Sequence, residues 1–530
     1  MSLITHPGPA RARALAVAVP GAVALVLGLW GLDRGTMWRD EAATVMAASR
    51  TLPQLWQLLG TIDAVHGLYY LLMHFLLPLY PGEVLLRLPS VCGAAAAASL
   101  VAAVGTRLVR PRTGLWAGLL YAVAPFTQYY AQEGRSYALV AAGAAAATLL
   151  CVRAVREPSG RAWTAYAAAV ALTAWLHEFA ILVIPAHAVT LAVTRVPRRV
   201  WRGWGGAAAA AAVSLLPLAL VTRGQSAQVG WIRRPGRADA EALLRMAAGG
   251  HGLLYAATLA LIAVAVSRPP ARAAKGAPGL VGTALPLALL PPLILLALSQ
   301  WHPLYAPRYA FFAFAGVPLL VAAGAEALVS RVPRLAPAAT APALAGLGLI
   351  AVAFLAQLPL QEHQRSTHAR RDDLGSVARM LSAELKPGEP LLYVPKTGRK
   401  YAEAYPASVA GTRDVSLLTS GARSGTLYGR DVGAAALRAR MACLPRLWVY
   451  FDAEAARPGW RSRTAADTAK LDVLRADFRP VRQDRRQSGT VRLYERVGGA
   501  APGCPAVRDA PGNVPESPRK SPYPTLQPMG

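Results

Sequence analysis

Acidic side chains are scarce in the first 360 residues of this 530-residue chain. That stretch contains eleven Asp and Glu residues against 28 Lys and Arg residues. In the whole chain only 16% of residues are charged, while 54% are hydrophobic. This composition is too apolar for a soluble protein, and the chain is too long to fold around one core. The sequence therefore predicts a polytopic α-helical membrane protein.

Cysteine and the common cofactor motifs are also sparse. The chain has four cysteines and no CxxC or HExxH pattern, which argues against a structural zinc site. A disulfide between Cys443 and Cys504 is an open alternative. There is no Gly-rich dinucleotide fingerprint, and the glycines of TSGARSGTLYGR are interpreted as loop residues. No cofactor is expected, although clustered acids leave a Mg²⁺ or Mn²⁺ ion open.

Apolar runs near the length of a transmembrane helix recur along the first two thirds of the chain. Many of them are rich in alanine, so close contacts between small side chains should hold the helices together. About eleven spans are expected, at residues 14–31, 84–105, 114–128, 136–152, 161–176, 179–194, 206–222, 249–266, 279–299, 309–329 and 335–357.

Arg and Lys collect in alternate loops, as in the turns at residues 107–112 and 195–202. The positive-inside rule then places the N-terminus in the cytoplasm and most acidic residues on the outer face. The first apolar run has no small-residue cleavage site before Asp40, so we interpret it as a retained anchor. The formal net charge of +28 suits anionic membrane lipids, and nucleic acid is not an expected partner.

Beyond residue 357 the composition becomes charged and mixed. Helical spacing at residues 374–385, 434–441 and 466–477 alternates with strand patterns at 391–394 and 447–451, followed by a hairpin at 480–496. This alternation predicts a small α/β domain. The expected organisation is a transmembrane domain at 1–357, an extracytoplasmic α/β domain at 358–497 and a disordered tail at 498–530.

The segment WRDEAAT places Asp40 and Glu41 side by side directly after the first apolar run. Charged groups at a membrane are costly, which makes this pair a candidate for a functional site. The alternative is that Asp40 only caps a helix that begins at Glu41. Capping would explain one acid but neither of the nearby residues Asp63 and His66.

Further polar residues fall in loops on the same predicted outer face. Arginine is suited to a lipid phosphate because its planar guanidinium stays charged and makes paired hydrogen bonds. Beside the catalytic candidates Asp40 and Glu41, the substrate-binding candidates are Asp63, His66, Glu133, Arg135, Tyr137, His177, Arg308 and Tyr309.

Several of these segments together resemble a known family. The DE pair, DxxH with LYYLLxH, RLPS at residues 87–90, YYAQEGRSYAL and a late PRY are similar to GT-C fold glycosyltransferases that use polyprenyl-phosphate sugars. The resemblance covers residues 10–330 and is greatest to protein mannosyltransferases and lipid A aminoarabinose transferases. It implies that Asp40 is the catalytic base, with Glu41 beside it. This chain departs from the pattern at HGLYY, where relatives commonly have HPPLYY.

The resemblance implies an inverting transferase in the cell membrane. It would move a sugar, with mannose as the expected one, from a polyprenyl phosphate to a hydroxyl of an envelope lipid, glycan or protein acceptor. The alternative is a multi-span transporter or flippase for a lipid-linked or envelope substrate. A transporter should carry ionisable groups in the middle of its helices, whereas the acids here collect at one face.

Overall fold

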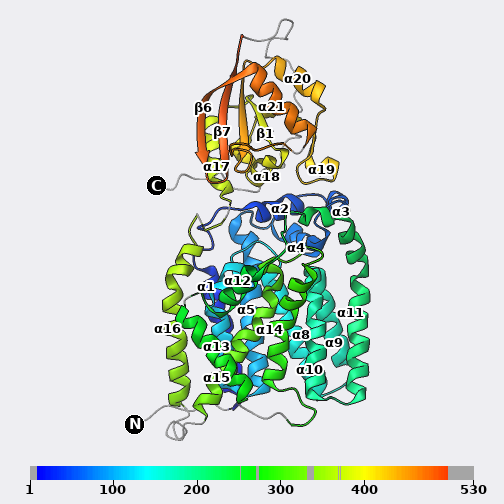
Figure 1. Cartoon of the computed structure of the whole chain (residues 1–530), viewed down its shortest axis with the longest axis vertical. Coiled ribbons are helices and arrows are strands. Elements are labelled where there is room, and N and C mark those ends of the chain that lie inside the picture. The colour runs from blue at the N-terminus through cyan, green and yellow to red at the C-terminus, as the bar shows by residue number, and fades with distance from the viewer. Residues whose placement is uncertain are drawn as a thin grey trace. The chain divides into compact units, whose positions relative to one another are not determined.

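The computed structural model describes residues 9–250, 252–269, 274–330, 340–367, 369–370, 372–462 and 464–498. These residues form two compact units (Figure 1). Within the described residues, the helical unit consists of residues 9–32, Ala64–Tyr69 and Arg87–Arg365. The sheet unit consists of Asp33–Asp63, Tyr70–Leu86 and residues 366–498. The predicted tail and Cys504 lie outside the described residues, as do Arg272, Arg331 and Arg334 of the predicted inner loops.

The helical unit is a bundle whose longer helices lie side by side (Figure 1). Short 3₁₀ segments interrupt it at η1 (Ala64–His66), η2 (Glu178–Leu182), η3 (Ser226–Val229) and η4 (Pro307–Ala315). The α-helices are α1 (Pro9–Leu29), α5 (Glu83–Leu108), α6 (Pro111–Val123), α7 (Pro125–Ala131), α8 (Tyr137–Arg156), α9 (Gly160–Leu176), α10 (Val183–Thr194), α11 (Arg198–Gly224), α12 (Arg237–Ala248), α13 (Gly252–Ser267), α14 (Leu280–Leu298), α15 (Gly316–Val329) and α16 (Thr340–Gln364).

Each of the eleven predicted apolar runs overlaps a helix, which confirms the multi-span helical class. Fewer of the described helices are long enough to cross a membrane than the eleven spans expected from the sequence. Among the described residues, seven helices are long and apolar enough to cross a membrane, or eight if the bent pair α12 and α13 forms one span. The remaining predicted runs are shorter helices, such as α6 with 13 residues and α10 with 12. Hydropathy alone does not distinguish a full span from a short buried helix.

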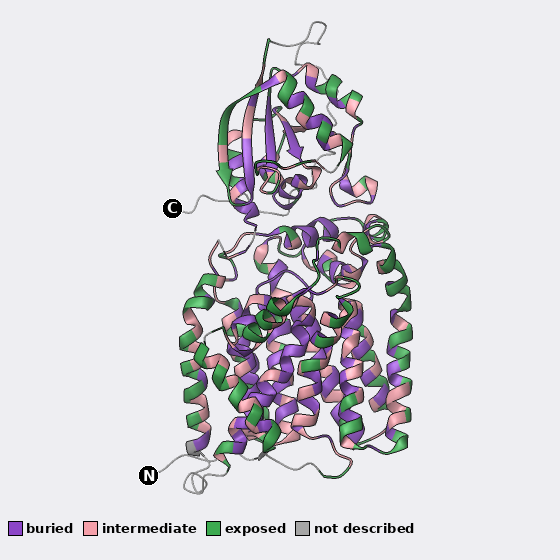
Figure 2. Cartoon of the chain, viewed as in Figure 1, coloured by how far each residue is buried: buried purple, intermediate pink, exposed green. Residues whose placement is uncertain are grey.

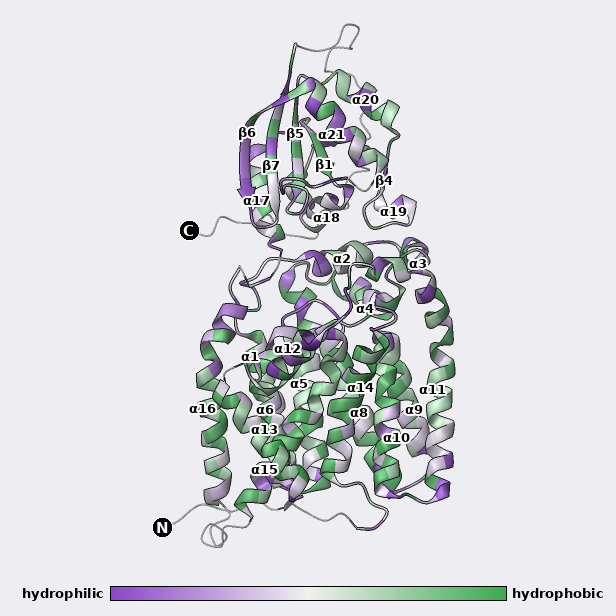
Figure 3. Ribbon diagram, viewed as in Figure 1, coloured by the Kyte–Doolittle hydropathy of each residue, from purple (hydrophilic) through white to green (hydrophobic). Residues whose placement is uncertain are grey.

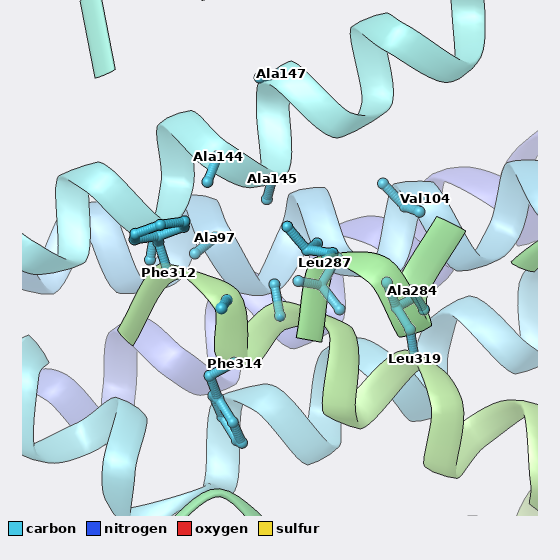
Figure 4. Packing of buried hydrophobic residues seen from close by; sticks show 14 of the residues in the cluster. Ala97, Val104, Ala144, Ala145, Ala147, Ala284, Leu287, Phe312, Phe314 and Leu319 are labelled. Atoms are coloured by element: carbon cyan, nitrogen blue, oxygen red, sulfur yellow. The ribbon is translucent and has the colours of Figure 1, made fainter. Parts of the chain in front are cut away.

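Small residues allow the helices of this unit to pack closely, as the sequence predicted. A Cβ atom on Gly93 of α5 would lie 2.8 Å from the backbone nitrogen of Leu139 in α8. A continuous core of alanine, valine and aromatic side chains joins α5, α8, α14 and α15 (Figure 4). Close approach of backbones replaces the bulky interdigitation that larger side chains would give.

The peripheral helices of the bundle expose their apolar side chains (Figure 2). In the most apolar stretch of α16 only 11% of the residues are buried, whereas 78% are buried in the corresponding stretch of η4 and α15. Leu349, Val352 and Leu355 of α16 are all at least 60% exposed. Between their ends the same helices are mostly hydrophobic (Figure 3), which is the surface expected of helices that face lipid.

The sheet unit is built on a five-stranded sheet in the order β2-β1-β5-β7-β6. Strand β1 (Pro390–Val394) is parallel to β2 (Arg413–Asp414) and to β5 (Arg446–Asp452). Strand β7 (Gly489–Arg496) is antiparallel to β5 and to β6 (Phe478–Arg486). Helices α17 (Leu374–Glu384), α20 (Ala434–Ala442) and α21 (Ala465–Asp477) accompany the sheet, and the helices and strands predicted after residue 357 are confirmed.

The remaining elements of the sheet unit are short. Three precede the sheet in sequence, namely α2 (Arg39–Ala48), α3 (Leu52–Leu59) and α4 (Gly67–Leu76), the last of which begins in the helical unit. The others lie between β1 and α20 and are η6 (Lys396–Arg399), α18 (Lys400–Ala404), η7 (Pro406–Val409), β3 (Leu417–Thr419), α19 (Gly421–Ser424) and β4 (Arg430–Asp431).

Candidate functional site

The paired acids lie in the first turn of α2, within the sheet unit. Trp38 is the N-cap residue of this helix and has an extended backbone, so Asp40 and Glu41 are its second and third residues. The alternative that Asp40 caps a helix beginning at Glu41 is therefore wrong. Two carboxylates in the first turn face the positive end of the helix dipole, which stabilises them there.

The two acids differ in their surroundings. Glu41 is fully buried, and its Oε2 accepts a hydrogen bond of 3.4 Å from the backbone N–H of Trp38. That bond closes the first turn in the manner of a capping box. Asp40 is half-buried. Glu41 is therefore engaged in the helix terminus and is more deeply buried than Asp40.

Asp63 follows helix α3 and has an unusual backbone conformation. Its φ angle is +58°, a left-handed geometry that is costly for most side chains and tolerated best by Gly, Asn and Asp. The Tyr70 hydroxyl donates a 2.9 Å hydrogen bond to the Asp63 Oδ2. The pairing holds the carboxylate in place at a position where the backbone stores strain.

Tyr428 belongs to the same group of charges. Burial raises the pKa of its phenol, and the negative charges of Asp63 and Asp40 raise that pKa further. The phenol therefore stays protonated and can donate a hydrogen bond. The sheet unit brings Asp40, Asp63 and Tyr428 into one electrostatic neighbourhood although they are far apart in sequence.

In the helical unit, four predicted site residues converge from four separate segments. His177, which follows α9, lies at the centre of this group. Its ring centroid is 4.9 Å from that of Tyr309 in η4, 5.6 Å from Tyr137 at the start of α8 and 5.7 Å from His66 in η1. We call His66, Tyr137, His177 and Tyr309 the ring cluster.

Two arginines place a positive field on the ring cluster. Burial lowers the pKa of His177 to about 3, and the charges of Arg308 and Arg135 add to that shift. The pKa of His66 is also lowered, by burial first and then by Arg135, His177 and Arg308. Both imidazoles are therefore neutral at pH 7, and the field in this region favours an anion.

Arg308 is oriented by aromatic rings. Its guanidinium carbon lies 5.2 Å from the ring centroid of Tyr309 and 5.4 Å from that of Trp231. These are cation–π distances, at which the rings stabilise the cation without neutralising it. Arg308 therefore keeps its full positive charge beside the ring cluster.

Glu133 and Arg135 lie on the tightly held loop between α7 and α8. The Gln132 amide donates to the carbonyl oxygens of Gly28 and Trp30 at 2.9 and 2.7 Å. The Ser90 hydroxyl, from the RLPS motif, donates to the carbonyl oxygen of Arg135 at 2.7 Å. Glu133 and Arg135 are both buried, and Glu133 adds to the effect of burial in raising the pKa of Tyr130. Bonds from the end of α1 and from α5 thus fix the loop that carries these charges.

The structure shows three participants that the sequence did not single out, Tyr70, Tyr428 and Trp231. Tyr70 belongs to LYYLLxH and Tyr428 to SGTLYGR, so each stands in a recognised motif without an assigned role. Trp231 has no sequence signal of this kind. Among the described residues, no three His, Cys, Asp or Glu side chains are grouped so as to hold a metal ion.

The segment that leads into α2 is fixed by residues of the C-terminal domain, which we define as residues 366–498 of the sheet unit. The Tyr405 hydroxyl accepts a 2.9 Å hydrogen bond from the Met37 N–H and donates a 2.7 Å bond to Glu83. Arg39 makes a paired contact with Asp372, at 2.6 and 3.3 Å. The C-terminal domain therefore sets the position of the segment that precedes Asp40.

Arg50 anchors the other end of α2. This buried side chain donates to the Met46 carbonyl oxygen at 3.1 Å and to the Thr426 carbonyl oxygen at 2.7 Å. Thr426 lies in the SGTLYGR segment, two residues before Tyr428. Both ends of α2 are thus bonded to the C-terminal domain.

Comparison with solved structures identifies the fold. Crystal structures of ArnT from Cupriavidus metallidurans, in the apo state and bound to undecaprenyl phosphate, align with 90% of this chain and 97% of their own length. Their TM-scores are 0.55 and 0.56, at 13% sequence identity. The chain has the GT-C fold. This result confirms the fold that the sequence motifs predicted.

The other comparisons give less. No protein-family model matches the chain, and no curated protein matches it. The arabinosyltransferase EmbB from Mycobacterium smegmatis aligns with 63% of this GT-C chain and 32% of its own length, at 18% identity. The TM-score of this alignment is 0.39.

Replacing Tyr405 by Phe should loosen the start of α2. The substitution removes a hydroxyl that accepts from the buried Met37 N–H and donates to Glu83. Leaving a buried N–H unpaired costs ~1–3 kcal/mol. Hydrogen–deuterium exchange of residues 37–42 should accelerate by roughly tenfold or more.

Tyr450→Phe is the matched control. It also removes a buried tyrosine hydroxyl, one that donates to the Ser488 carbonyl oxygen at 2.7 Å within the C-terminal domain. Equal acceleration of residues 37–42 in both variants would show that Tyr405 does not hold this segment.

Proposed function

We propose that this chain is an integral-membrane glycosyltransferase that moves a sugar from a polyprenyl-phosphate donor to an acceptor hydroxyl. The observation that carries the proposal is the arrangement of Arg135, Arg308 and two neutral histidines in a protein with the ArnT fold. One of the aligned ArnT structures is bound to undecaprenyl phosphate, an anion of the class that such a field favours.

The reaction needs few chemical parts because a sugar phosphate already has a good leaving group. A carboxylate takes the proton from the acceptor hydroxyl while the hydroxyl oxygen attacks the anomeric carbon. The bond between that carbon and the phosphate oxygen breaks, and the electron pair leaves with the polyprenyl phosphate. A single displacement inverts the configuration at the anomeric carbon.

We assign the base to Asp40, because this residue is half-buried while Glu41 is fully buried in the turn of α2. Glu41 then fixes the helix terminus that carries Asp40. Asp63, held by Tyr70, is assigned to orientation of the acceptor or the sugar.

On the donor side, Arg135 and Arg308 are assigned to the phosphate. As the leaving group gains charge, fixed cations stabilise it without reorganisation. The ring cluster and Glu133 supply neutral rings and one carboxylate that can orient sugar hydroxyls. The proposal of mannose as the sugar rests on the resemblance of the sequence motifs, and the proposed acceptors are an envelope lipid, glycan or protein.

The transfer is proposed to take place on the outer side of the cytoplasmic membrane. The loop arginines support this orientation through the positive-inside rule. Protease added to intact spheroplasts should then digest the C-terminal domain, as followed with an antibody against residues 434–462. Protection until lysis would place this domain in the cytoplasm and reverse the orientation.

Asp40→Asn should abolish most of the activity. The substitution keeps the shape of the side chain and removes its basicity, which should reduce turnover by ~100-fold to 10,000-fold. Sugar transfer to the acceptor would be measured under single-turnover conditions, together with binding of undecaprenyl phosphate, which should change little.

Glu41→Gln serves as the paired variant and should do less. The glutamine oxygen can still accept the hydrogen bond from Trp38, so the turn of α2 is kept. Normal turnover in Asp40→Asn with a dead Glu41→Gln would exchange the two roles. Full activity in both would rule out this pair as the source of the base.

Arg308→Lys should weaken binding of the donor. Lysine keeps the positive charge but loses the planar fork and its stacking on Tyr309 and Trp231. A charged hydrogen bond is worth ~1.5–3 kcal/mol, so the Kd for undecaprenyl phosphate should rise by roughly 10-fold to 150-fold. Titration of the protein in detergent measures this change.

Arg245→Lys is the matched control. Arg245 is another arginine of the helical unit stacked on a tyrosine, with its guanidinium carbon 5.6 Å from the ring centroid of Tyr255, and it lies outside the ring cluster. An unchanged Kd in both variants would remove Arg308 from the proposed phosphate site.

A further inference from the structure

The C-terminal domain contains a pocket of about 440 Å³ that has no part in the proposed transfer step. Its volume lies within the range of small-molecule sites, roughly 300–1,000 Å³. The side chains that give it chemical character are aromatic or cationic, namely Phe451, Trp460, Tyr494, Arg457, Arg475 and Arg492.

The pocket is formed between the sheet and α21, beneath the loop at residues 455–460. Its floor belongs to the core of the domain, since Phe451, Leu474 and Tyr494 are all less than 10% exposed. Gly459, in a left-handed conformation with φ of +79°, turns the loop just before Trp460. A rigid apolar floor thus lies under a rim of longer polar side chains.

The charges of the rim are of one sign, because the described residues that line the pocket include three arginines and no Asp or Glu. The guanidinium carbon of Arg492 lies 5.0 Å from the ring centroid of Phe451, and its Nε donates to Gln483 at 2.8 Å. Arg475 has one distant ion pair, 4.0 Å from Asp472, in which both side chains are more than half exposed. Such an exposed pair contributes little, so the rim favours an anion.

We propose that this pocket binds a saccharide that carries a carboxylate or a phosphate group. A sugar ring has an apolar C–H face, which can pack on Trp460 and the aromatic floor, and polar edges that can reach the rim. Arginine forks bind carboxylate and phosphate oxygens through paired hydrogen bonds. A small inorganic anion would leave the aromatic surface unused, and an apolar ligand would make no use of the three guanidinium groups on the rim.

Such a pocket would let the transferase bind an acidic glycan acceptor through a part of the glycan that does not include the reacting hydroxyl. This role rests on the proposed function, whereas saccharide binding by the pocket does not. An anchor of this kind raises the effective concentration of the acceptor hydroxyl at the catalytic groups.

The test uses the purified full-length protein in detergent and calorimetric titration with three probes. These are trigalacturonic acid, glucose 6-phosphate and the neutral trisaccharide maltotriose. We expect trigalacturonic acid or glucose 6-phosphate to bind and maltotriose to bind at least about tenfold more weakly. The stronger of the two anionic probes distinguishes a carboxylate from a phosphate as the natural group.

Two variants locate the binding. Arg457→Gln combined with Arg475→Gln, and separately Trp460→Ala, should each lower the affinity by about tenfold or more. Arg479→Gln is the matched control, because Arg479 is an exposed β6 residue between the lining residues Phe478 and Pro480 but does not itself line the pocket. It should bind like the unmodified protein. Thermal unfolding of each variant confirms that the domain is folded.

The outcomes separate the two proposals. Absence of binding at millimolar concentration of both anionic probes, equal binding of maltotriose, or an equal loss in Arg479→Gln would each overturn the pocket assignment. Probe binding that is retained in Asp40→Asn supports the pocket whatever that variant does to sugar transfer. Conversely, sugar transfer can proceed as proposed with a small neutral acceptor even if the pocket binds nothing.

Discussion

The hydroxyl group of Tyr405 links the backbone just before Asp40 to the start of α5. This hydroxyl accepts a hydrogen bond from the Met37 N–H and donates one to the Glu83 carboxylate. Helix α2 has only ten residues, too few for independent stability in water. The position of Asp40 therefore depends on long-range hydrogen bonds and on the Arg39 contact with Asp372, rather than on the local sequence.

The scarcity of acidic residues has an electrostatic counterpart in the helical unit. Arg135 and Arg308 act together with burial to lower the pKa values of His66 and His177. Carboxylates close to these rings would oppose the contribution of the two arginines, which adds to the larger effect of burial. A region with positive charge and neutral rings is suited to a ligand that brings its own negative charge and polar hydroxyl groups.

The sequence predicts the regular elements better than their convergence. The apolar runs and the alternation after residue 357 follow local periodicity, so helices such as α8 and strands such as β5 are placed within a few residues. The number of spans is not predictable in this way, since a short helix such as α10 is as apolar as a full span. Long-range contacts leave no periodic signal, which is why the field of Asp40 and Asp63 on Tyr428 becomes visible only in the structure.

The composition of the sheet unit imposes an order on the folding of the nascent chain. Its first pieces, Asp33–Asp63 and Tyr70–Leu86, are separated from Ser366 by the main part of the helical unit, about 280 residues. At ~5–20 residues per second, ribosomal synthesis of that stretch takes on the order of 15–60 s. During this interval Met37, Arg39 and Arg50 have none of their C-terminal partners. The segment bearing Asp40 can therefore complete these contacts only after the chain has been made as far as Thr426.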